Sequence, residues 1–285
     1  MNDAYQEILM PVPVELRQKA RQLLEELQSF GSCLVAFSGG IDSTLLARAG
    51  KLVLGEKVLA VTAVMQSMAS GRLEQCRSAA EAIGVPLLTV EIRELDDPCY
   101  RANDPMRCYY CKRILFSRLR ALATERGLAV VVDGTNADDL GDFRPGAKAA
   151  EEFAIRSPLV DCGFRKSEVR TLARAWGVPD PDRPSTTCLS TRIAYGLEVT
   201  PERLRMIDAA EKFLREQGFV PLRVRYHPGE IARIEVPPSM FERLLDGQLR
   251  EEIVRALKAA GFKFVTLDLE GFRSGSMNVL VSTTR

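Results

Sequence analysis

The stretch Leu34-Val-Ala-Phe-Ser-Gly-Gly-Ile-Asp-Ser43 decides the fold, because an apolar run ends in two glycines and a helical pattern follows directly. Adjacent glycines let the backbone turn sharply and approach a ligand with no Cβ in the way. The free N–H groups and the dipole at the start of the following helix favour an anion. The stretch therefore predicts a strand, a phosphate-binding turn and a helix.

The alternative for these residues is an ordinary strand-to-helix turn, in which glycine is common. Three polar side chains directed at one point, Ser38, Asp42 and Ser43, favour the phosphate-binding interpretation instead. No Gly-Lys-Ser/Thr follows the glycines, so this is not a Walker loop.

Strand and helix patterns alternate around this turn. Apolar strands are predicted at 33–37, 58–63, 85–92 and 129–133, and helices at 13–30, 43–54, 70–83, 110–126 and 167–176. Strands without polar alternation are typical of a parallel sheet covered by helices on both faces, which makes the fold class α/β. Ligands of such sheets bind at the carboxyl ends of the strands, so we expect the Ser38 turn and the Asp133-Gly134-Thr135-Asn136 stretch at one edge.

A proline-rich segment at 178–184 and the following Gly196 mark a domain boundary, which gives domains 1–196 and 197–285. The second domain opens with a helix at Thr200-Pro201, where a hydroxyl cap precedes proline at the first helical position. Strands are expected at 221–226, 231–236, 262–269 and 276–282, with a helix at 239–260. This pattern predicts a small α+β domain with predominantly antiparallel strand pairing.

Composition describes an ordinary globular protein: 285 residues, 46% hydrophobic and 27% charged, with a net charge of +1. Such a balance provides no global field for nucleic acid or a membrane, so neither is expected as a partner. No signal-peptide pattern and no apolar run of membrane-spanning length is present, and we expect a cytoplasmic protein.

Seven cysteines, an odd number, argue against a disulfide framework. Cys108 and Cys111 form a CxxC pair at or just before a helix start, a spacing that serves metals, redox disulfides or neither. Cys188 lies in a polar, arginine-flanked loop that favours the thiolate. If the three meet, they leave one coordination position open, as at the unique iron of an iron–sulfur cluster; His227, the one histidine, makes zinc less suitable. The alternative is that the three cysteines never converge.

The turn at Ser38 resembles the pyrophosphate loop of the N-type, or PP-loop, ATP pyrophosphatases, whose fold is HUP-like. Other motifs resemble the LarE family of sulfur transferases over nearly the whole chain. These are Cys108-Tyr-Tyr-Cys111-Lys, the stretch 133–146, Ser157-Pro-Leu, the stretch 188–196, Arg223-Val-Arg225 with Ala232-Arg-Ile-Glu235, and the stretch 271–278.

The LarE resemblance implies an ATP-dependent, AMP-forming sulfur transfer. A carboxylate of pyridinium-3,5-biscarboxylic acid mononucleotide is adenylated, and sulfur displaces AMP to give a thiocarboxylate for the nickel-pincer nucleotide cofactor of lactate racemase. Family members take the sulfur from a sulfide on a [4Fe-4S] cluster or from a sacrificed cysteine. The presence of three cysteines favours the cluster, while sacrifice of Cys188 stays open. The resemblance also implies Mg²⁺, sulfide or another sulfur donor, and a homo-oligomer with six subunits.

Residue roles follow from this resemblance together with side-chain chemistry. The residues assigned to ATP binding are Ser38, Gly39, Gly40, Asp42, Ser43, Gly134 and Asn136, and Asp42 is expected near Mg²⁺ as a catalytic residue. The residues assigned to substrate binding are Arg192, Glu211, Arg223 and Arg225. The metal cluster is assigned to Cys108, Cys111 and Cys188, and Cys188 is also expected to be catalytic. A solvated strand face is the alternative for Arg223 and Arg225. Asp138, Asp139 and Asp142 receive no individual role.

Two further functional classes remain. One is another PP-loop enzyme, a tRNA thiolase or an amide synthetase; the near-neutral charge and the single CxxC pair count against the first. The other is a nucleotide- or iron–sulfur-binding protein without turnover, which would have no need of an intact Ser38–Ser43 loop.

Overall fold

The computed structural model describes residues 5–141, 145–183, 187–273 and 275–278. The chain divides into two compact units. Unit 1 comprises Met1–Met65, Gly71–Ile92 and Cys108–Thr186, and unit 2 comprises Gln66–Ser70, Arg93–Arg107 and Thr187–Arg285. The division after Thr186 precedes the predicted boundary at Gly196, and unit 2 also takes two segments from the first half of the chain.

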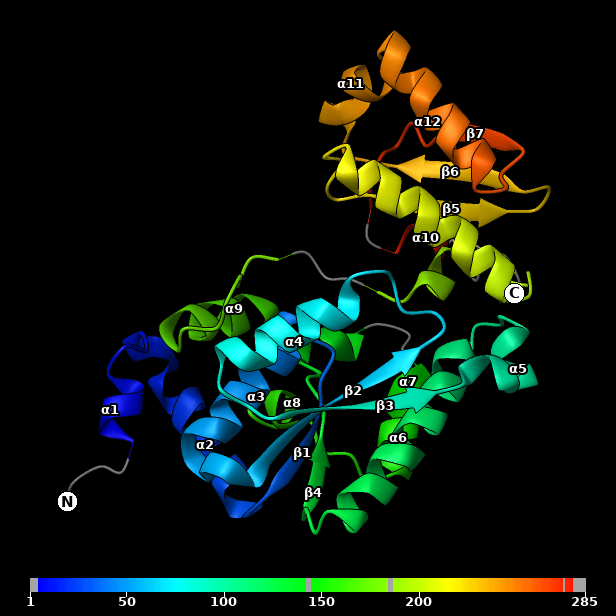
Figure 1. The fold of residues 1–285 in the computed structure, drawn as a ribbon. Coiled ribbons are helices and arrows are strands. Elements are labelled where there is room, and N and C mark those ends of the chain that lie inside the picture. Colours follow the sequence, from blue (N-terminus) through cyan, green and yellow to red (C-terminus); the bar gives the residue numbers. More distant parts are fainter. Residues whose placement is uncertain (1–4, 142–144, 184–186, 274, 279–285) are drawn as a thin grey trace. The chain divides into compact units, whose positions relative to one another are not determined.

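Unit 1 is built on a four-stranded sheet of order β3-β2-β1-β4, shown in Figure 1. The strands are β1 (Cys33–Ala36), β2 (Val58–Met65), β3 (Leu87–Ile92) and β4 (Val130–Val132), and every pairing is parallel. The predicted α/β class with a parallel sheet is confirmed. The unit's helices are α1 (Gln6–Leu9), α2 (Arg17–Ser29), α3 (Ile41–Leu54), α4 (Arg72–Ala82), α6 (Arg107–Glu125), α7 (Pro145–Glu152), α8 (Pro158–Asp161) and α9 (Lys166–Ala175).

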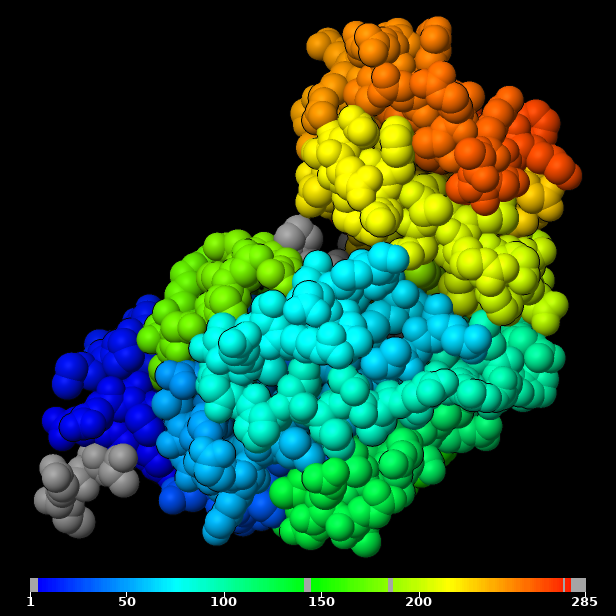
Figure 2. Space-filling model, viewed as in Figure 1, coloured from blue at the N-terminus to red at the C-terminus, as the bar shows by residue number. Residues whose placement is uncertain are grey.

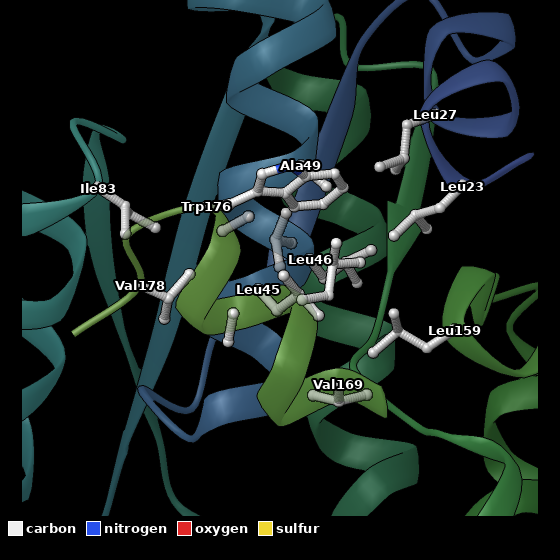
Figure 3. Close-up of a cluster of buried hydrophobic side chains, with 14 of the residues drawn as sticks. Leu23, Leu27, Leu45, Leu46, Ala49, Ile83, Leu159, Val169, Trp176 and Val178 are labelled. Atoms are coloured by element: carbon white, nitrogen blue, oxygen red, sulfur yellow. The ribbon is translucent and has the colours of Figure 1, made fainter. Parts of the chain in front are cut away.

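Side chains alternate along β1, and this alternation creates two hydrophobic layers. Cys33 and Val35 pack with α2, α3 and α9, where Leu46 and Trp176 meet (Figure 3). Leu34 points the other way and packs with α6 through residues such as Phe116. Both faces of the sheet are therefore covered. Figure 2 shows the surface of the molecule on which α4, in cyan, and α9, in light green, are exposed.

Unit 2 contains a three-stranded sheet of order β5-β6-β7, formed by β5 (Arg223–His227), β6 (Ile231–Glu235) and β7 (Phe264–Leu267). Its helices are α5 (Pro98–Arg101), α10 (Pro201–Glu216), α11 (Phe241–Leu245) and α12 (Gly247–Ala259). Thr200 caps α10 as predicted, since its side chain accepts a hydrogen bond from the Arg203 N–H at 3.3 Å.

Three predictions for this unit need correction. β5 and β6 are antiparallel, but β6 and β7 are parallel, because two helices carry the chain back between them. The helix predicted at 239–260 is broken at Asp246, whose side chain caps α12. In place of the strand at 276–282, Ser276–Asn278 form a 3₁₀ turn, and 279–282 lie outside the described residues.

Among the helices of the described ranges, none has both the length and the apolarity needed to cross a membrane.

Candidate active site

The turn after β1 closes on itself through two serines. Gly39 has φ +65°, a left-handed conformation that suits glycine, and Gly40 precedes the first residue of α3. The Ser43 hydroxyl lies 3.2 Å from both the Ser38 N and the Ser38 Oγ, and it donates to the Gly40 carbonyl at 3.1 Å. Ser38 and Ser43 therefore hold the loop over the N-terminus of α3, where free N–H groups favour an anion.

Helix α4 supports this loop from one side. A Cβ on Gly39 would lie 2.9 Å from the Cys76 Sγ, so only glycine fits at this contact. The Cys76 thiol donates to the Ser38 carbonyl at 3.3 Å, and burial raises its pKa, which keeps it in the donor form. The Arg72 guanidinium donates to the same carbonyl.

The loop after β4 packs against the other side of the turn. A Cβ on Gly134 would lie only 2.7 Å from the backbone N of Ser43, so glycine is required for this close approach. The preceding Asp133 is buried and accepts hydrogen bonds from Thr135 and from the Ser157 hydroxyl, the latter at 2.7 Å. The structure thus brings the Ser38 loop and the Gly134 loop together at the carboxyl edge of the sheet.

Asp42 is held by two partners in the first turn of α3. Its carboxylate accepts from Asn136 Nδ2 at 3.1 Å and from Lys166 Nζ. Lys166 was not among the predicted site residues. Lys166 is the first residue of α9, where a positive charge is unfavourable because it opposes the helix dipole. This unfavourable position is the feature of the sequence that could have indicated a functional role for Lys166.

Asp138 and Asp139 shape the backbone next to this contact. Asp139 accepts from the Asn136 N–H at 3.0 Å and Asp138 from the Lys166 N–H at 2.8 Å. These two carboxylates thus position Asn136 and Lys166, the two partners of Asp42. Asp142 lies outside the described residues.

In unit 2, Arg192 and Glu211 form a fully buried ion pair. The Arg192 Nε lies 2.9 Å from Glu211 Oε1, and both side chains are 1% exposed. The same carboxylate oxygen accepts the Val224 N–H at 3.1 Å. This pair joins α10, β5 and the segment after Cys188 around one buried charge pair.

Arg225 is also buried, at 6% exposure, so a solvated strand face is wrong for this residue. Its Nη2 bonds to Glu235 at 2.8 Å and to the Ser276 hydroxyl at 3.0 Å, and its Nη1 donates to the Thr191 carbonyl. The guanidinium therefore ties β5 to β6 and to two loops of unit 2.

Arg223 is half-buried, with its guanidinium 5.1 Å from the centroid of the Phe272 ring. Burial first, and then the positive charge of Arg192, lower the pKa of Arg223 to about 10. Arg225 contributes to this lowering, while Glu211 and Glu235 oppose it. A cation that nearby cations destabilise is a favourable place for an anionic ligand.

Cys188 lies at the N-terminal end of a short 3₁₀ turn, Leu189–Arg192, in unit 2. Its Sγ is 3.1 Å from the Ser190 hydroxyl, which also accepts from the Tyr100 hydroxyl at 2.9 Å. The Leu189 N–H donates to the Ser67 carbonyl at 2.8 Å. The Cys188 loop is therefore fixed by the two early segments that unit 2 takes from the chain.

Cys108 and Cys111 occupy the first turns of α6 in unit 1, where Cys108 is exposed and Cys111 half-buried. Neither of them forms a disulfide, and neither does Cys188. The part of the chain that the structure describes contains no group of three or more Cys, His, Asp or Glu side chains arranged to hold a metal ion. We therefore derive no reaction step through a cluster.

Comparison with known proteins defines the class first. No family model matches the chain. It is 32% identical to the tRNA-specific 2-thiouridylase of Azorhizobium caulinodans over 195 residues, 54% of this chain and 49% of that protein. The parallel sheet and the Ser-Gly-Gly-Ile-Asp-Ser turn after its first strand make the protein a PP-loop ATP pyrophosphatase, an ATP-using enzyme.

The family follows from two more similar relatives. The chain is 38% identical over 264 residues to the pyridinium-3,5-bisthiocarboxylic acid mononucleotide synthase of Lactiplantibacillus plantarum, covering 92% of this chain and 95% of the relative. It is 40% identical to an uncharacterised protein of Synechocystis, over 92% of this chain and 98% of that one. The chain belongs to the LarE family of ATP-dependent sulfur transferases.

Proposed function

We propose that this enzyme adenylates a carboxylate of pyridinium-3,5-biscarboxylic acid mononucleotide and replaces AMP by sulfur. A carboxylate oxygen attacks the α-phosphorus of ATP and pyrophosphate leaves. A sulfur nucleophile then attacks the acyl carbon, and AMP departs with the carboxylate oxygen, which leaves a thiocarboxylate. The Ser38–Ser43 loop, closed over the start of α3 in a LarE-family chain, is the observation that carries this proposal.

The ATP step is assigned to unit 1. The backbone N–H groups of the loop and the hydroxyls of Ser38 and Ser43 bind the pyrophosphate portion, and Gly134 and Asn136 keep the adjoining wall close. Asp42 would be a ligand of Mg²⁺, because a carboxylate supplies the oxygen that this ion prefers, and the ion would compete with Lys166 for it. The ion would neutralise charge on the phosphate oxygens.

Substrate binding is assigned to unit 2. Arg223 and Arg225 are proposed to hold the phosphate and carboxylates of the pyridinium nucleotide, since guanidinium groups match such anions bidentately. Arg192 and Glu211 contribute the buried ion pair that adjoins them. A buried, positively charged group of side chains supports an anionic substrate rather than a neutral one.

For the sulfur source we retain the proposal that Cys108, Cys111 and Cys188 hold a [4Fe-4S] cluster. Its support is that none of these three cysteines forms a disulfide and that Cys108 and Cys111 have the CxxC spacing typical of metal ligands. The alternative is Cys188 alone as a sacrificial donor, supported by a thiol next to the Ser190 hydroxyl in a loop fixed by buried contacts. A homo-oligomer and an external sulfide donor belong to the same proposal.

The test of the function is pyrophosphate release from ATP in the presence of the pyridinium nucleotide. Asp42→Asn should abolish this release while the protein stays folded, because the substitution removes the carboxylate charge and keeps the side-chain shape. Asp182→Asn is the matched control, since Asp182 is exposed and pairs only with Arg174 among the described residues. Release by Asp42→Asn at the wild-type rate would remove the adenylation step from this proposal.

A further inference from the structure

Arg72, on α4, lies against the Ser38–Ser43 loop. Its Nη2 donates to the Ser38 carbonyl and would lie 3.8 Å from a Cβ built on Gly40. Its Nη1 donates to the Gln75 side chain at 3.2 Å. Within the described ranges these partners are neutral, and no carboxylate pairs with this guanidinium. A full positive charge therefore stands beside the glycines with its charge uncompensated.

A cavity of about 340 Å³ adjoins the loop in unit 1. Gly39 and Thr44 line it from the loop and α3, Gln75 lines it from α4, and Arg183 lines it from the segment after α9. Because a water molecule takes about 30 Å³ in the liquid, the space is ample for phosphate groups. Arg72 lies behind this wall, where its Nη1 donates to the side chain of the lining residue Gln75.

The cation that lines this cavity is Arg183. Burial lowers the pKa of Arg72 and the charge of Arg183 adds to that lowering, which places Arg183 within electrostatic range of the loop. The acids of the cavity wall already have partners: Asp180 pairs with Arg183 at 2.8 Å and Glu74 pairs with Arg77 at 3.3 Å. Arg72 and Arg183 carry two positive charges and Asp180 carries one negative charge, so the net charge of these three side chains is positive.

Mutual repulsion of two guanidiniums is relieved by an anion bound between or beside them. A polyphosphate is the suitable class, because the adjoining helix N-terminus and serine hydroxyls also favour phosphate. We propose that Arg72 and Arg183 bind the β- and γ-phosphates of ATP and retain the pyrophosphate product. This inference deepens the proposed function and rests on ATP being the substrate of the Ser38–Ser43 loop.

The experiment measures binding of Mg-ATP, inorganic pyrophosphate and AMP to the full-length protein by titration calorimetry. Arg72→Gln and Arg183→Gln should each raise the Kd for pyrophosphate and for ATP about tenfold or more, the effect of losing a charge-assisted contact. The Kd for AMP, which lacks both phosphates, should not change. Arg118→Gln is the matched control, because Arg118 lies in unit 1 outside the cavity lining and pairs with the exposed Glu125.

The outcomes separate this inference from the function beneath it. If the wild type binds neither ATP nor pyrophosphate, the proposed function fails and this inference fails with it. If the wild type binds both ligands and each variant binds pyrophosphate as tightly as the wild type does, only the inference is overturned. The inference is also overturned if either variant weakens AMP binding as much as it weakens pyrophosphate binding. That result would indicate a distorted loop rather than a lost phosphate contact.

Discussion

At the residue scale, the candidate site depends on what the glycines exclude. Gly39 and Gly134 each stand where a single added carbon would meet Cys76 or the backbone of Ser43. The loop is thus packed between α4 and the segment after β4, and it is in close contact with both. Close backbone packing of this kind preorganises N–H groups for an anion before the ligand arrives.

Gly134→Ala should weaken ATP binding strongly and lower the free energy of unfolding by about 1–3 kcal/mol, because the new methyl group would force the first turn of α3 to move. Gly247→Ala is the control: Gly247 has open space around it and should be neutral or slightly stabilising. Denaturant titrations and ATP titrations of both variants measure these effects. Unchanged ATP affinity in Gly134→Ala would contradict the close approach described above.

His227 gives the protein a specific pH dependence. Burial first, and then the charge of Arg233, lower its pKa below the ordinary 6.5. Its Nε2 accepts from the Arg233 Nε at 3.1 Å, which requires the neutral ring. As pH falls through and below 6.5, the unfolded chain takes up the proton more readily than the folded one, so stability is lost.

His227→Gln should therefore flatten the pH dependence of the melting temperature below pH 6.5 and leave it unchanged above that value. The comparison needs only thermal unfolding curves of both proteins across this range. His227 is the one histidine of the chain, so no second imidazole obscures the result. Parallel curves for the two proteins below pH 6.5 would show that the buried ring is not responsible.

At the element scale, α10 combines a capped start with a buried charge. Glu211 lies on its inner face, where it pairs with Arg192 and accepts the Val224 N–H from β5. Removing one member of a buried pair leaves the other charge without compensation, at a cost of about 3–5 kcal/mol. The helix is consequently coupled to β5 by this buried carboxylate.

Glu211→Gln should lower the free energy of unfolding by about 3–5 kcal/mol, the cost of stranding the Arg192 charge. Glu216→Gln, on the same helix, should change it by less than about 1 kcal/mol, because the pair of Glu216 with Lys212 at 4.0 Å is exposed. Urea titrations compare the two variants. Similar losses in both would mean that the buried pair contributes no more than a surface pair.

Local sequence pattern predicted most of unit 1, because each apolar strand is followed by an amphipathic helix and the order alone implies a parallel sheet. It was less informative for unit 2. The direction of β7 depends on how its connection crosses the sheet, and no local pattern records that. The burial of Arg225 was also invisible, since alternation along β5 shows which residues share a face but not what covers it. The contact of Lys166 with Asp42 joins residues far apart in sequence.

At the scale of the whole molecule, the three cysteines of the proposed sulfur step are divided between the two units. Cys108 and Cys111 belong to unit 1 and Cys188 to unit 2. In the cluster mechanism all three cysteines are metal ligands and stay intact. In the sacrificial mechanism Cys188 loses its sulfur, so the mass of the protein after turnover distinguishes the two.

If a cluster carries the sulfide, alanine substitution of any one of the three cysteines should abolish both iron content and sulfur transfer, while ATP binding persists. Cys99→Ala is the control, because Cys99 is an exposed free thiol outside the set. Intact-protein mass spectrometry after anaerobic turnover should show no mass change. Loss of the mass of H₂S at Cys188, with Cys108→Ala and Cys111→Ala fully active, would establish the sacrificial mechanism instead.

The interleaving of the two units has a consequence for synthesis on the ribosome. Residues 93–107 emerge long before 187–285, yet Asn103 donates to the carbonyls of Ala194 and Leu197, and Arg107 to that of Ser190. Until those later residues leave the exit tunnel, the Asn103 amide lacks the Ala194 and Leu197 carbonyls as acceptors, and the Arg107 guanidinium lacks that of Ser190. The nascent chain must therefore keep this segment solvated, and a pause in translation before residue 187 would prolong the interval in which it is open to proteases and chaperones.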